Sequence, residues 1–184
     1  MGYARRAGCD PLSPPVQYAY GCGAGAGRVA LCLGWLWQSL HSQIHPRWRN
    51  IATWGGPGHG PGDFSIVHNI GCDRTGRLLV CDRENDRIQL FDPDGNYLEE
   101  WTGLEMPGDV WITPYNTIYV AEQGGSGHVS VWSPDGRLIS RFSGAPGGVL
   151  EAPHGICVDA QGSIYVAKIG GPGRGQRLQK FARV

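Results

Sequence analysis

The feature that most constrains this chain is a unit of short apolar segments separated by turn residues, which recurs from residue 68 to residue 181. In the first copy the segments are His68 to Asp73, Gly76 to Asp82, Arg87 to Phe91 and Tyr97 to Trp101. The matching segments are 108–113, 117–122, 128–132 and 138–142 in the second copy, and 154–159, 162–168 and 177–181 in the third. Each segment has the length of a β-strand, and four-stranded units repeated radially are typical of a β-propeller.

Glycine and proline usage supports this interpretation. The thirty glycines and thirteen prolines lie mostly between the apolar segments, where tight turns are expected. Asp94-Gly95 and Asp135-Gly136 are predicted to form hairpin turns, because glycine adopts positive φ without a Cβ clash. Frequent short strands joined by such turns favour an all-β protein.

The repeats amount to about three blades, preceded by Ile51 to Trp54, which is predicted to be the closing strand of an earlier blade. Propellers usually close with four to eight blades. We therefore predict an all-β fold, a partial β-propeller of about three blades that corresponds to the C-terminal part of a six-bladed pattern. Open blade faces would be apolar, which predicts self-association through them.

Residues 1–45 do not follow the repeat and form an unassigned leader, either disordered or unrelated to the blades, whereas 46–184 form the propeller region. The longest apolar run, Val29 to Trp37, is about half of the roughly 20 residues that a membrane helix needs. Sixteen basic and sixteen acidic residues balance, so neither a nucleic acid nor a membrane is expected as a partner. The sequence leaves secreted, periplasmic and cytoplasmic locations open.

The six cysteines contain no C-x-x-C pair, which argues against a cysteine zinc site. Three of them, Cys72, Cys81 and Cys157, fall inside apolar segments. They are expected to be buried free thiols, since cysteine packs as a small hydrophobe. A disulfide is the alternative, and the choice depends on the redox compartment.

Two histidines open equivalent segments. The first strand of each propeller blade lines the central channel, so equivalent positions in different blades lie at similar depth around one axis. His68 and His154 open the first and third copies, with Gly108 at that position in the second. Three histidines with an open position make a catalytic zinc site, and these two are candidate ligands. The simpler interpretation is that each histidine turns the chain and binds a backbone carbonyl.

Arg83 directly follows the second segment of the first copy, where the other copies have Gln123 and Ile169. A guanidinium can bind a carboxylate through two parallel hydrogen bonds, which makes Arg83 a candidate ligand-binding residue. A plain surface charge is the alternative. Arg87, four residues further on, is expected to be a surface residue of the hairpin.

The pattern G-x-hydrophobic-x-V-x-D-x-x-N-x-R-I-Q-x-F of Gly76 to Phe91 resembles NHL repeats. More narrowly, the run from His68 to Gln89, followed by Pro153-His154, resembles peptidyl-α-hydroxyglycine α-amidating lyase, with similarity over about residues 51–184.

This resemblance implies a six-bladed propeller with zinc held by three inner histidines, two of which match His68 and His154. It also implies that Arg83 is the active-site arginine, which binds the substrate carboxylate or stabilises developing negative charge. The third histidine, the catalytic tyrosine and a second arginine of that family have no match here, and Gly155 replaces its calcium-binding aspartate.

Two functions from different classes follow. The resemblance implies a zinc-dependent lyase that cleaves peptidyl-α-hydroxyglycine to a peptide amide and glyoxylate, incomplete in this chain, with a small peptide as substrate. The alternative is a non-catalytic NHL-repeat propeller that acts as a protein-interaction scaffold and binds a protein partner.

Overall fold

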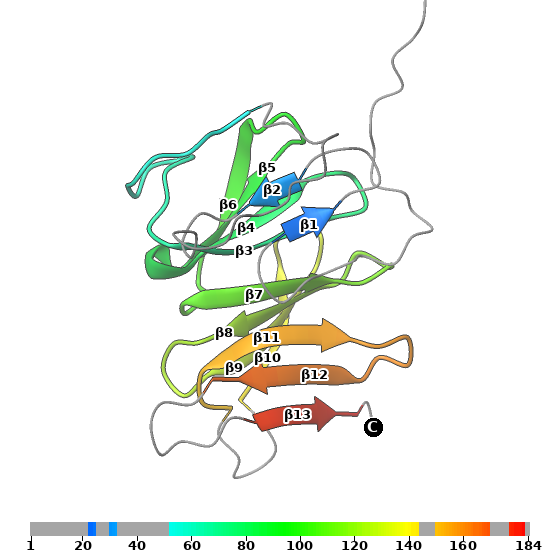
Figure 1. Ribbon diagram of the computed structural model, residues 1–184. Helices are drawn as coiled ribbons and strands as arrows, with labels where there is room; N and C mark the ends of the chain where they lie inside the picture. Colours follow the sequence, from blue (N-terminus) through cyan, green and yellow to red (C-terminus); the bar gives the residue numbers. More distant parts are fainter. Residues whose placement is uncertain (1–21, 25–29, 33–51, 144–149, 170–176, 183–184) are drawn as a thin grey trace, which may run out of the picture.

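A computed structural model of the chain describes residues 22–24, 30–32, 52–143, 150–169 and 177–182. These residues form three antiparallel sheets that follow one another along the chain, with a two-stranded ribbon beside the first (Figure 1). The prediction of an all-β, partial β-propeller is confirmed, and each sheet coincides with one copy of the sequence repeat. We call the sheets blade one, blade two and blade three.

The strands occur in each sheet in the order in which they occur in the chain. Blade one contains β3 (Val67–Cys72), β4 (Leu78–Asp82), β5 (Arg87–Phe91) and β6 (Tyr97–Trp101), with the 3₁₀ turn η1 (Arg83–Asn85) between β4 and β5. Blade two contains β7 (Pro107–Ile112), β8 (Ile118–Glu122), β9 (His128–Trp132) and β10 (Leu138–Phe142). Blade three contains β11 (Pro153–Val158), β12 (Ile164–Lys168) and β13 (Arg177–Phe181) among the described residues.

The leader contributes β1 (Cys22–Ala24) and β2 (Ala30–Cys32), which pair antiparallel. The rest of residues 1–45, and most of the apolar run from Val29, lie outside the described residues. No helix in the described ranges has the length and apolar character needed to cross a membrane.

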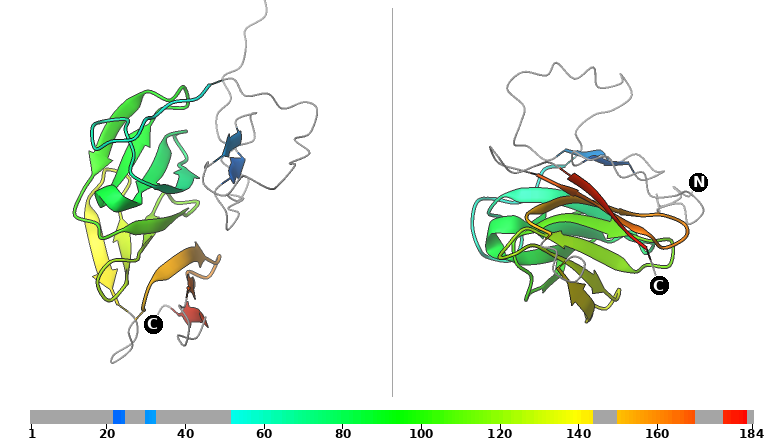
Figure 2. Two further views of the ribbon diagram at one scale, coloured as in Figure 1. Left: turned by 60° about the vertical axis from the view of Figure 1, so that its left-hand side comes forward. Right: turned by 90° about the horizontal axis from the view of Figure 1, so that it is seen from below.

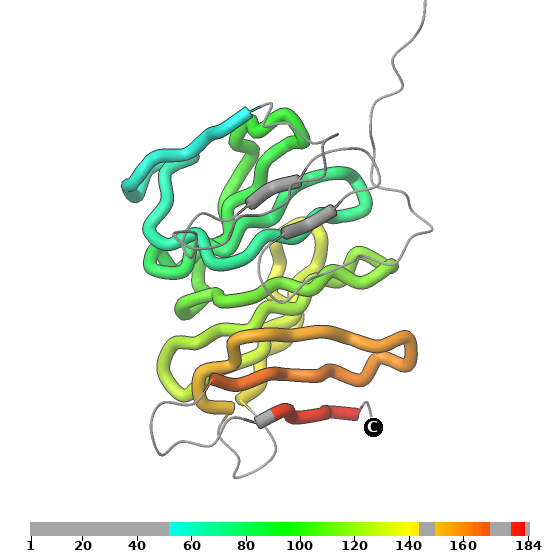
Figure 3. The backbone as a smooth tube through the Cα atoms, in the orientation of Figure 1, coloured from blue at the N-terminus to red at the C-terminus, as the bar shows by residue number. Residues whose placement is uncertain are grey.

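The first strands of the blades lie next to each other. β7 contacts both β3 and β11, and the two views of Figure 2 show the three blades fanning out from this inner row. The backbone trace in Figure 3 shows the same course repeated in successive blades. Residues at the start of β3, β7 and β11 are therefore brought to one region, as a propeller requires.

Among the described residues, two core clusters join neighbouring blades, and a third consists of buried residues of blade one. Leu79 and Ile88 of blade one pack against Val110 and Val120 of blade two, and all four are at most 1% exposed. A second cluster joins blade two to blade three, through residues that include Val129, Ile156 and Val166. Burying each such side chain contributes about 1.5–3 kcal/mol, so each blade depends on its neighbours for stability.

An aromatic contact repeats at each blade boundary. Trp101, at the end of β6, stacks on Trp132 of blade two with ring centroids 5.9 Å apart, and Phe142 meets Phe181 of blade three at 5.5 Å. Trp54 makes the equivalent contact with Phe91 at 6.4 Å. The predicted terminal strand is wrong over residues 52–54, which are not in a strand. Trp54 nevertheless occupies the position of the last residue of a preceding outer strand.

The predicted glycine turns are confirmed, although each turn is longer than two residues. The turn Asp92–Gly95 is closed by a hydrogen bond from the Gly95 N–H to the Asp92 carbonyl (3.0 Å), and φ of Gly95 is +89°. Gly136 closes the matching turn of blade two with φ of +80°. Left-handed backbone at these positions accounts for the glycines.

The cysteine expectations are met only in part. Cys81 is a buried free thiol, as predicted, whereas Cys72 is disulfide-bonded. Cys157 is free but exposed. The prediction of burial is wrong for Cys157, because this residue lies on the side of blade three that no further blade covers within the described residues.

Candidate functional site

The two predicted histidines meet. His68 is the second residue of β3 and His154 the second residue of β11, so the repeat places both at the same end of the inner strands. Their rings lie edge to face with centroids 4.7 Å apart. Both side chains are half-buried. The symmetry argument made from the sequence alone therefore brings together two residues from non-adjacent blades.

Blade two has no histidine at the equivalent position. Gly108 occupies the position of the two histidines, and its carbonyl lies 2.5 Å from Nδ1 of His68. The side chain of Gln123 fills the space over Gly108, so that a Cβ there would overlap with the Gln123 amide. Nε2 of Gln123 is buried and has no hydrogen-bond partner among the described residues. Blade two therefore has Gly108 at the position of His68 and Gln123 at the position of Arg83.

Arg83 begins η1, directly after β4, and lies beside the histidine pair. Its side chain is 21% exposed and forms an ion pair with Glu84 at 2.8 Å. Burial lowers the pKa of both His68 and His154, and the positive charge of Arg83 lowers it further. The structure therefore groups all three site residues predicted from the sequence, His68, His154 and Arg83, at one end of the inner strands.

The connection that enters each blade holds this end of the molecule in place. Ile66, Met106 and Ala152 have left-handed φ values of +65°, +50° and +48°. The carbonyl of Ile66 accepts a hydrogen bond from the N–H of Arg83 (3.1 Å), and the carbonyl of Met106 accepts one from Gln123 (3.0 Å). Left-handed backbone is costly for such residues and persists where surrounding contacts enforce it. In successive blades, a left-handed residue before the first strand thus binds and positions the backbone of the residue after the second strand, which is Arg83 in blade one and Gln123 in blade two.

Both histidines favour the neutral state. Burial is the main cause that lowers the pKa of His68 and of His154 below the ordinary value of 6.5, and the charge of Arg83 adds to it. The carbonyl of Gly108 acts in the opposite direction on His68. Neutral imidazoles can accept a hydrogen bond or bind a metal ion at neutral pH.

A buried carboxylate below the histidines joins the three blades. Oδ2 of Asp109 accepts the Ile156 N–H of blade three (2.7 Å), and Oδ1 accepts the Val110 N–H (2.8 Å) and the Asn69 side chain of blade one. Burial raises the pKa of Asp109 to about 7 against the effect of these donors. Sequence reasoning missed this residue, although a charged side chain inside an inner strand is a signal in itself.

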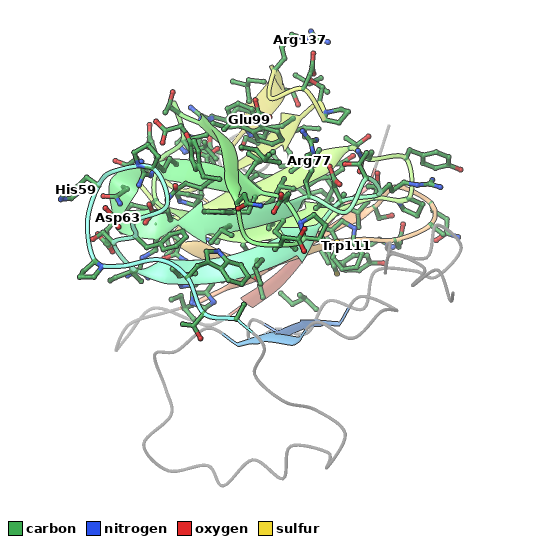
Figure 4. All side chains as sticks on the ribbon, turned by 90° about the horizontal axis from the view of Figure 1, so that it is seen from above. His59, Asp63, Arg77, Glu99, Trp111 and Arg137 are labelled. Atoms are coloured by element: carbon green, nitrogen blue, oxygen red, sulfur yellow. The ribbon has the colours of Figure 1, made fainter. Side chains whose placement is uncertain are left out.

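Arg87 corrects a second expectation. It is 6% exposed rather than on the surface, and its guanidinium lies 2.8 Å from Asp82, which is fully buried. The same guanidinium donates to backbone carbonyls of the loop that carries His59 and Asp63, which Figure 4 labels. Asp82 also accepts the Ser65 N–H at 2.7 Å. Arg87 thus ties the hairpin of blade one to the preceding loop.

A catalytic zinc site takes three protein ligands. His68 and His154 supply two, and the ranges that the structure describes contain no group of three or more His, Cys, Asp or Glu side chains able to hold a metal ion. These residues therefore do not complete the zinc site that the amidating-lyase resemblance implies.

Comparison with known proteins identifies the repeat. No protein-family model matches the chain. It is 35% identical over 133 residues to human NHL repeat-containing protein 3, a match that covers 67% of this chain and 37% of that protein. It is 42% identical over 50 residues to the Caenorhabditis elegans protein lin-41, which covers 27% of this chain and 4% of lin-41. The chain thus spans little more than a third of the first of these relatives.

The solved structures agree with the fold. A protein of unknown function from Bacteroides caccae superposes with a TM-score of 0.54 at 15% identity, covering 62% of this chain and 44% of that one. The chain is thus a homologue of NHL-repeat proteins, and its blades are those of a partial NHL-type β-propeller. These relatives lend no support to the finer resemblance to an amidating lyase.

Proposed function

We propose that these NHL-type blades act as a scaffold that binds a protein partner. The surface concerned is the end of the blades that carries η1, the hairpin 123–127 and the strained residues before β3, β7 and β11; we call it the hairpin face. Two exposed isoleucines, Ile66 (36% exposed) and Ile169 (49% exposed), lie on it. Between them are the polar groups of Arg83, Gln123 and the histidine pair.

The observation that carries the proposal is the combination, at one end of the blades, of two exposed isoleucines with the charged Arg83 and with Nε2 of Gln123, which has no hydrogen-bond partner among the described residues. Exposed isoleucines can anchor a partner, and arginine and buried amide groups can give specificity. By contrast, several turns at the opposite end satisfy their own polar groups. Asp73 accepts the Thr75 N–H (2.8 Å), and Asp159 accepts the Ser163 N–H (2.8 Å).

Affinity capture with the immobilised chain tests the proposal if variants are compared side by side. Ile169→Asp and Arg83→Ala are expected to lose a partner that the unaltered chain retains. Tyr115→Asp is the matched control, because Tyr115 is 90% exposed on a turn at the opposite end. A partner that is retained by Ile169→Asp and lost from Tyr115→Asp would place the binding surface on the wrong end and refute the proposal.

A second candidate function is supported by the contact between His68 and His154. With a third ligand from outside the described residues, the pair would bind zinc, and Arg83 would bind the carboxylate of a peptide that ends in α-hydroxyglycine. Zinc would supply a Lewis acid for cleavage to a peptide amide and glyoxylate. This chain's own residues would hold the ligand: the two imidazoles are neutral near pH 7, and the guanidinium carries the matching charge.

Calorimetric titration with Zn²⁺ tests this second candidate without relying on activity. Binding should be measurable for the unaltered chain and should be lost in both His68→Ala and His154→Ala. Release of glyoxylate from an α-hydroxyglycine peptide is the second measurement. Zinc binding that survives both substitutions would exclude these histidines as ligands.

A further inference from the structure

Blade one and blade two each bury a carboxylate at the same repeat position, but the surroundings of the two groups differ. Asp82 and Glu122 end the second strands of these blades, and both are fully buried. The two oxygens of Asp82 accept hydrogen bonds from the Ser65 N–H (2.7 Å) and from Nε of Arg87 (2.8 Å). Oε2 of Glu122 accepts the Glu105 N–H (2.6 Å), whereas its Oε1 has no hydrogen-bond partner among the described residues. Blade two therefore contains a buried carboxylate with one oxygen that lacks a donor.

The difference follows from the residue on the neighbouring strand. Arg87 stands opposite the carboxylate of blade one, and His128 occupies the same position opposite Glu122. Nδ1 of His128 lies 3.9 Å from Oε2 of Glu105, which is too far for a hydrogen bond, and it has no such bond to any other described residue. Glu122 receives a guanidinium from β10 instead, since Nη2 of Arg141 lies 3.0 Å from Oε2. The histidine thus leaves Oε1 without the donor that an arginine supplies in blade one.

Two more carboxylates lie beside Glu122, where blade one meets blade two. Oδ1 of Asp86, at the end of η1, accepts the Met106 N–H (2.7 Å), and the preceding N–H, that of Glu105, binds Glu122. The Glu105 side chain is 50% exposed. Gly125 leaves it uncovered, because a Cβ there would lie 3.0 Å from Oε2 of Glu105. We call Asp86, Glu105 and Glu122 the carboxylate cluster.

The carboxylate cluster contains more negative charges than positive partners. Among the residues that the structure describes, Arg141 is the only arginine or lysine that forms an ion pair with any of its three members. Elsewhere on the hairpin face the charges are matched, because Glu84 pairs with Arg83 and Glu151 pairs with Lys168. A local surplus of carboxylates on an otherwise paired surface attracts a positively charged group.

The arrangement of these carboxylates fits an extended cation. The described ranges contain no group of three or more His, Cys, Asp or Glu side chains able to hold a metal ion, so the cluster does not converge on one point. A guanidinium has five N–H donors spread over a planar fork, and it can bind several separated acceptors. Arg87 does this in blade one, where its guanidinium binds two carboxylates and three backbone carbonyls.

We infer that the protein partner proposed above docks an arginine side chain at the carboxylate cluster, with its guanidinium on the exposed Glu105. The inference rests on the proposed function and deepens it, because it gives the partner a basic residue in addition to the apolar residues that meet Ile66 and Ile169. The two blades that form the site are each present with all four strands. The guanidinium would supply in blade two the charge that Arg87 supplies in blade one.

Titration with N-acetyl-arginine amide tests the inference without a known partner. The backbone amide resonances of Glu105 and Met106 should shift and saturate, with a dissociation constant in the millimolar range. N-acetyl-citrulline amide, which has the same shape without the charge, should shift neither. Glu105→Gln should weaken the binding by about fivefold, since it removes one exposed charge. This variant should fold, because it keeps the backbone N–H that Glu122 accepts.

Glu99→Gln is the matched control. Glu99, labelled in Figure 4, has a side chain that is 48% exposed on β6, so the variant removes the same charge at nearly the same exposure away from the cluster. Its affinity for N-acetyl-arginine amide should equal that of the unaltered chain. Equal binding of the arginine and citrulline compounds, binding of neither, or equal losses in Glu99→Gln and Glu105→Gln would each overturn the inference.

Affinity capture separates this inference from the function on which it rests. Glu105→Gln should reduce retention of a partner that Glu99→Gln retains. If Ile169→Asp loses the partner while Glu105→Gln keeps it, the scaffold function stands and the arginine site is refuted. If the arginine compound binds as expected but no captured protein depends on Ile169, the site stands and the scaffold function fails.

Discussion

The rings of His68 and His154 lie edge to face, 4.7 Å apart, although one belongs to blade one and the other to blade three. They reach each other across blade two, whose residue at the same position is Gly108 and carries no side chain of its own. The contact is thus a property of the repeat register rather than of either residue alone.

The register predicts that a third imidazole can be added at Gly108. Gly108→His is combined with removal of the Gln123 side chain, because a Cβ at position 108 would overlap with the Gln123 amide where it now lies. The double variant Gly108→His with Gln123→Ala is expected to bind Zn²⁺ at least about tenfold more tightly than the unaltered chain, since a zinc site takes at least three protein ligands. Gly108→Ala with Gln123→Ala is the control that adds the Cβ alone. Equal zinc affinities in a calorimetric titration of both variants would contradict the prediction.

Two arginines on the same hairpin should differ sharply in their effect on stability. Arg87→Ala leaves the fully buried Asp82 without its charged partner and is expected to lower the free energy of unfolding by about 3–5 kcal/mol. Arg83→Ala removes only an exposed ion pair with Glu84 and should cost about 1 kcal/mol or less. Urea denaturation of the two variants measures the difference. Similar losses for both would mean that the burial of Arg87 does not govern its role.

The sequence predicted the fold and the candidate site for one reason: both follow from the repeat. Turn glycines and apolar segments recur at fixed separations, so the blades, the inner strands and the position of His68 relative to His154 could be read from the spacing. Arg83 was singled out because it directly follows the second segment of the first copy, where the other copies have Gln123 and Ile169, and because a guanidinium can bind a carboxylate.

The sequence analysis did not predict the environments of Arg87, Cys157 and Asp109. These environments depend on which other segments cover each residue, and the spacing of the repeat does not show that. From the sequence, Arg87 is expected to be a surface residue of the hairpin. In the structure, the loop before β3 covers it and supplies the carbonyl acceptors for its guanidinium. Cys157 lies in an apolar strand pattern that predicts burial, yet it is exposed, because no further blade covers its side of blade three within the described residues. Asp109 is surrounded by donors from three blades, and such a meeting point exists only once the blades are assembled.

Asp109 should make stability depend on pH in a defined direction. Its pKa in the folded chain is about 7, above the ordinary value of 3.8, because burial disfavours the charged form. Its contribution to stability is therefore complete below about pH 3.8 and is lost as the pH rises through 7. The unaltered chain should lose up to about 4 kcal/mol relative to Asp109→Asn across this window. Urea denaturation at several pH values measures the difference.

The comparison with Asp109→Asn is needed because the histidines act in the opposite direction. The pKa values of His68 and His154 are lowered in the folded chain, so their contribution is present above 6.5 and is lost as the pH falls. The unaltered chain and Asp109→Asn share this contribution of the histidines, so it cancels when their free energies of unfolding are subtracted. Parallel pH profiles for the unaltered chain and Asp109→Asn would show that Asp109 does not titrate as its burial requires.

The aromatic contact at each blade boundary can be tested with two glycines of equal backbone conformation. Gly136 and Gly162 have φ of +80° and +83°, but a Cβ at Gly136 would lie 2.8 Å from Cδ1 of Trp101, whereas one at Gly162 would meet nothing within 4 Å. Gly162→Ala should therefore cost about 1–2 kcal/mol for the left-handed backbone alone. Gly136→Ala should cost about 1–3 kcal/mol more, because Trp101 must move away from Trp132. Equal thermal shifts for the two variants would mean that the boundary tolerates displacement of Trp101, and that this stacking does not hold the blades in register.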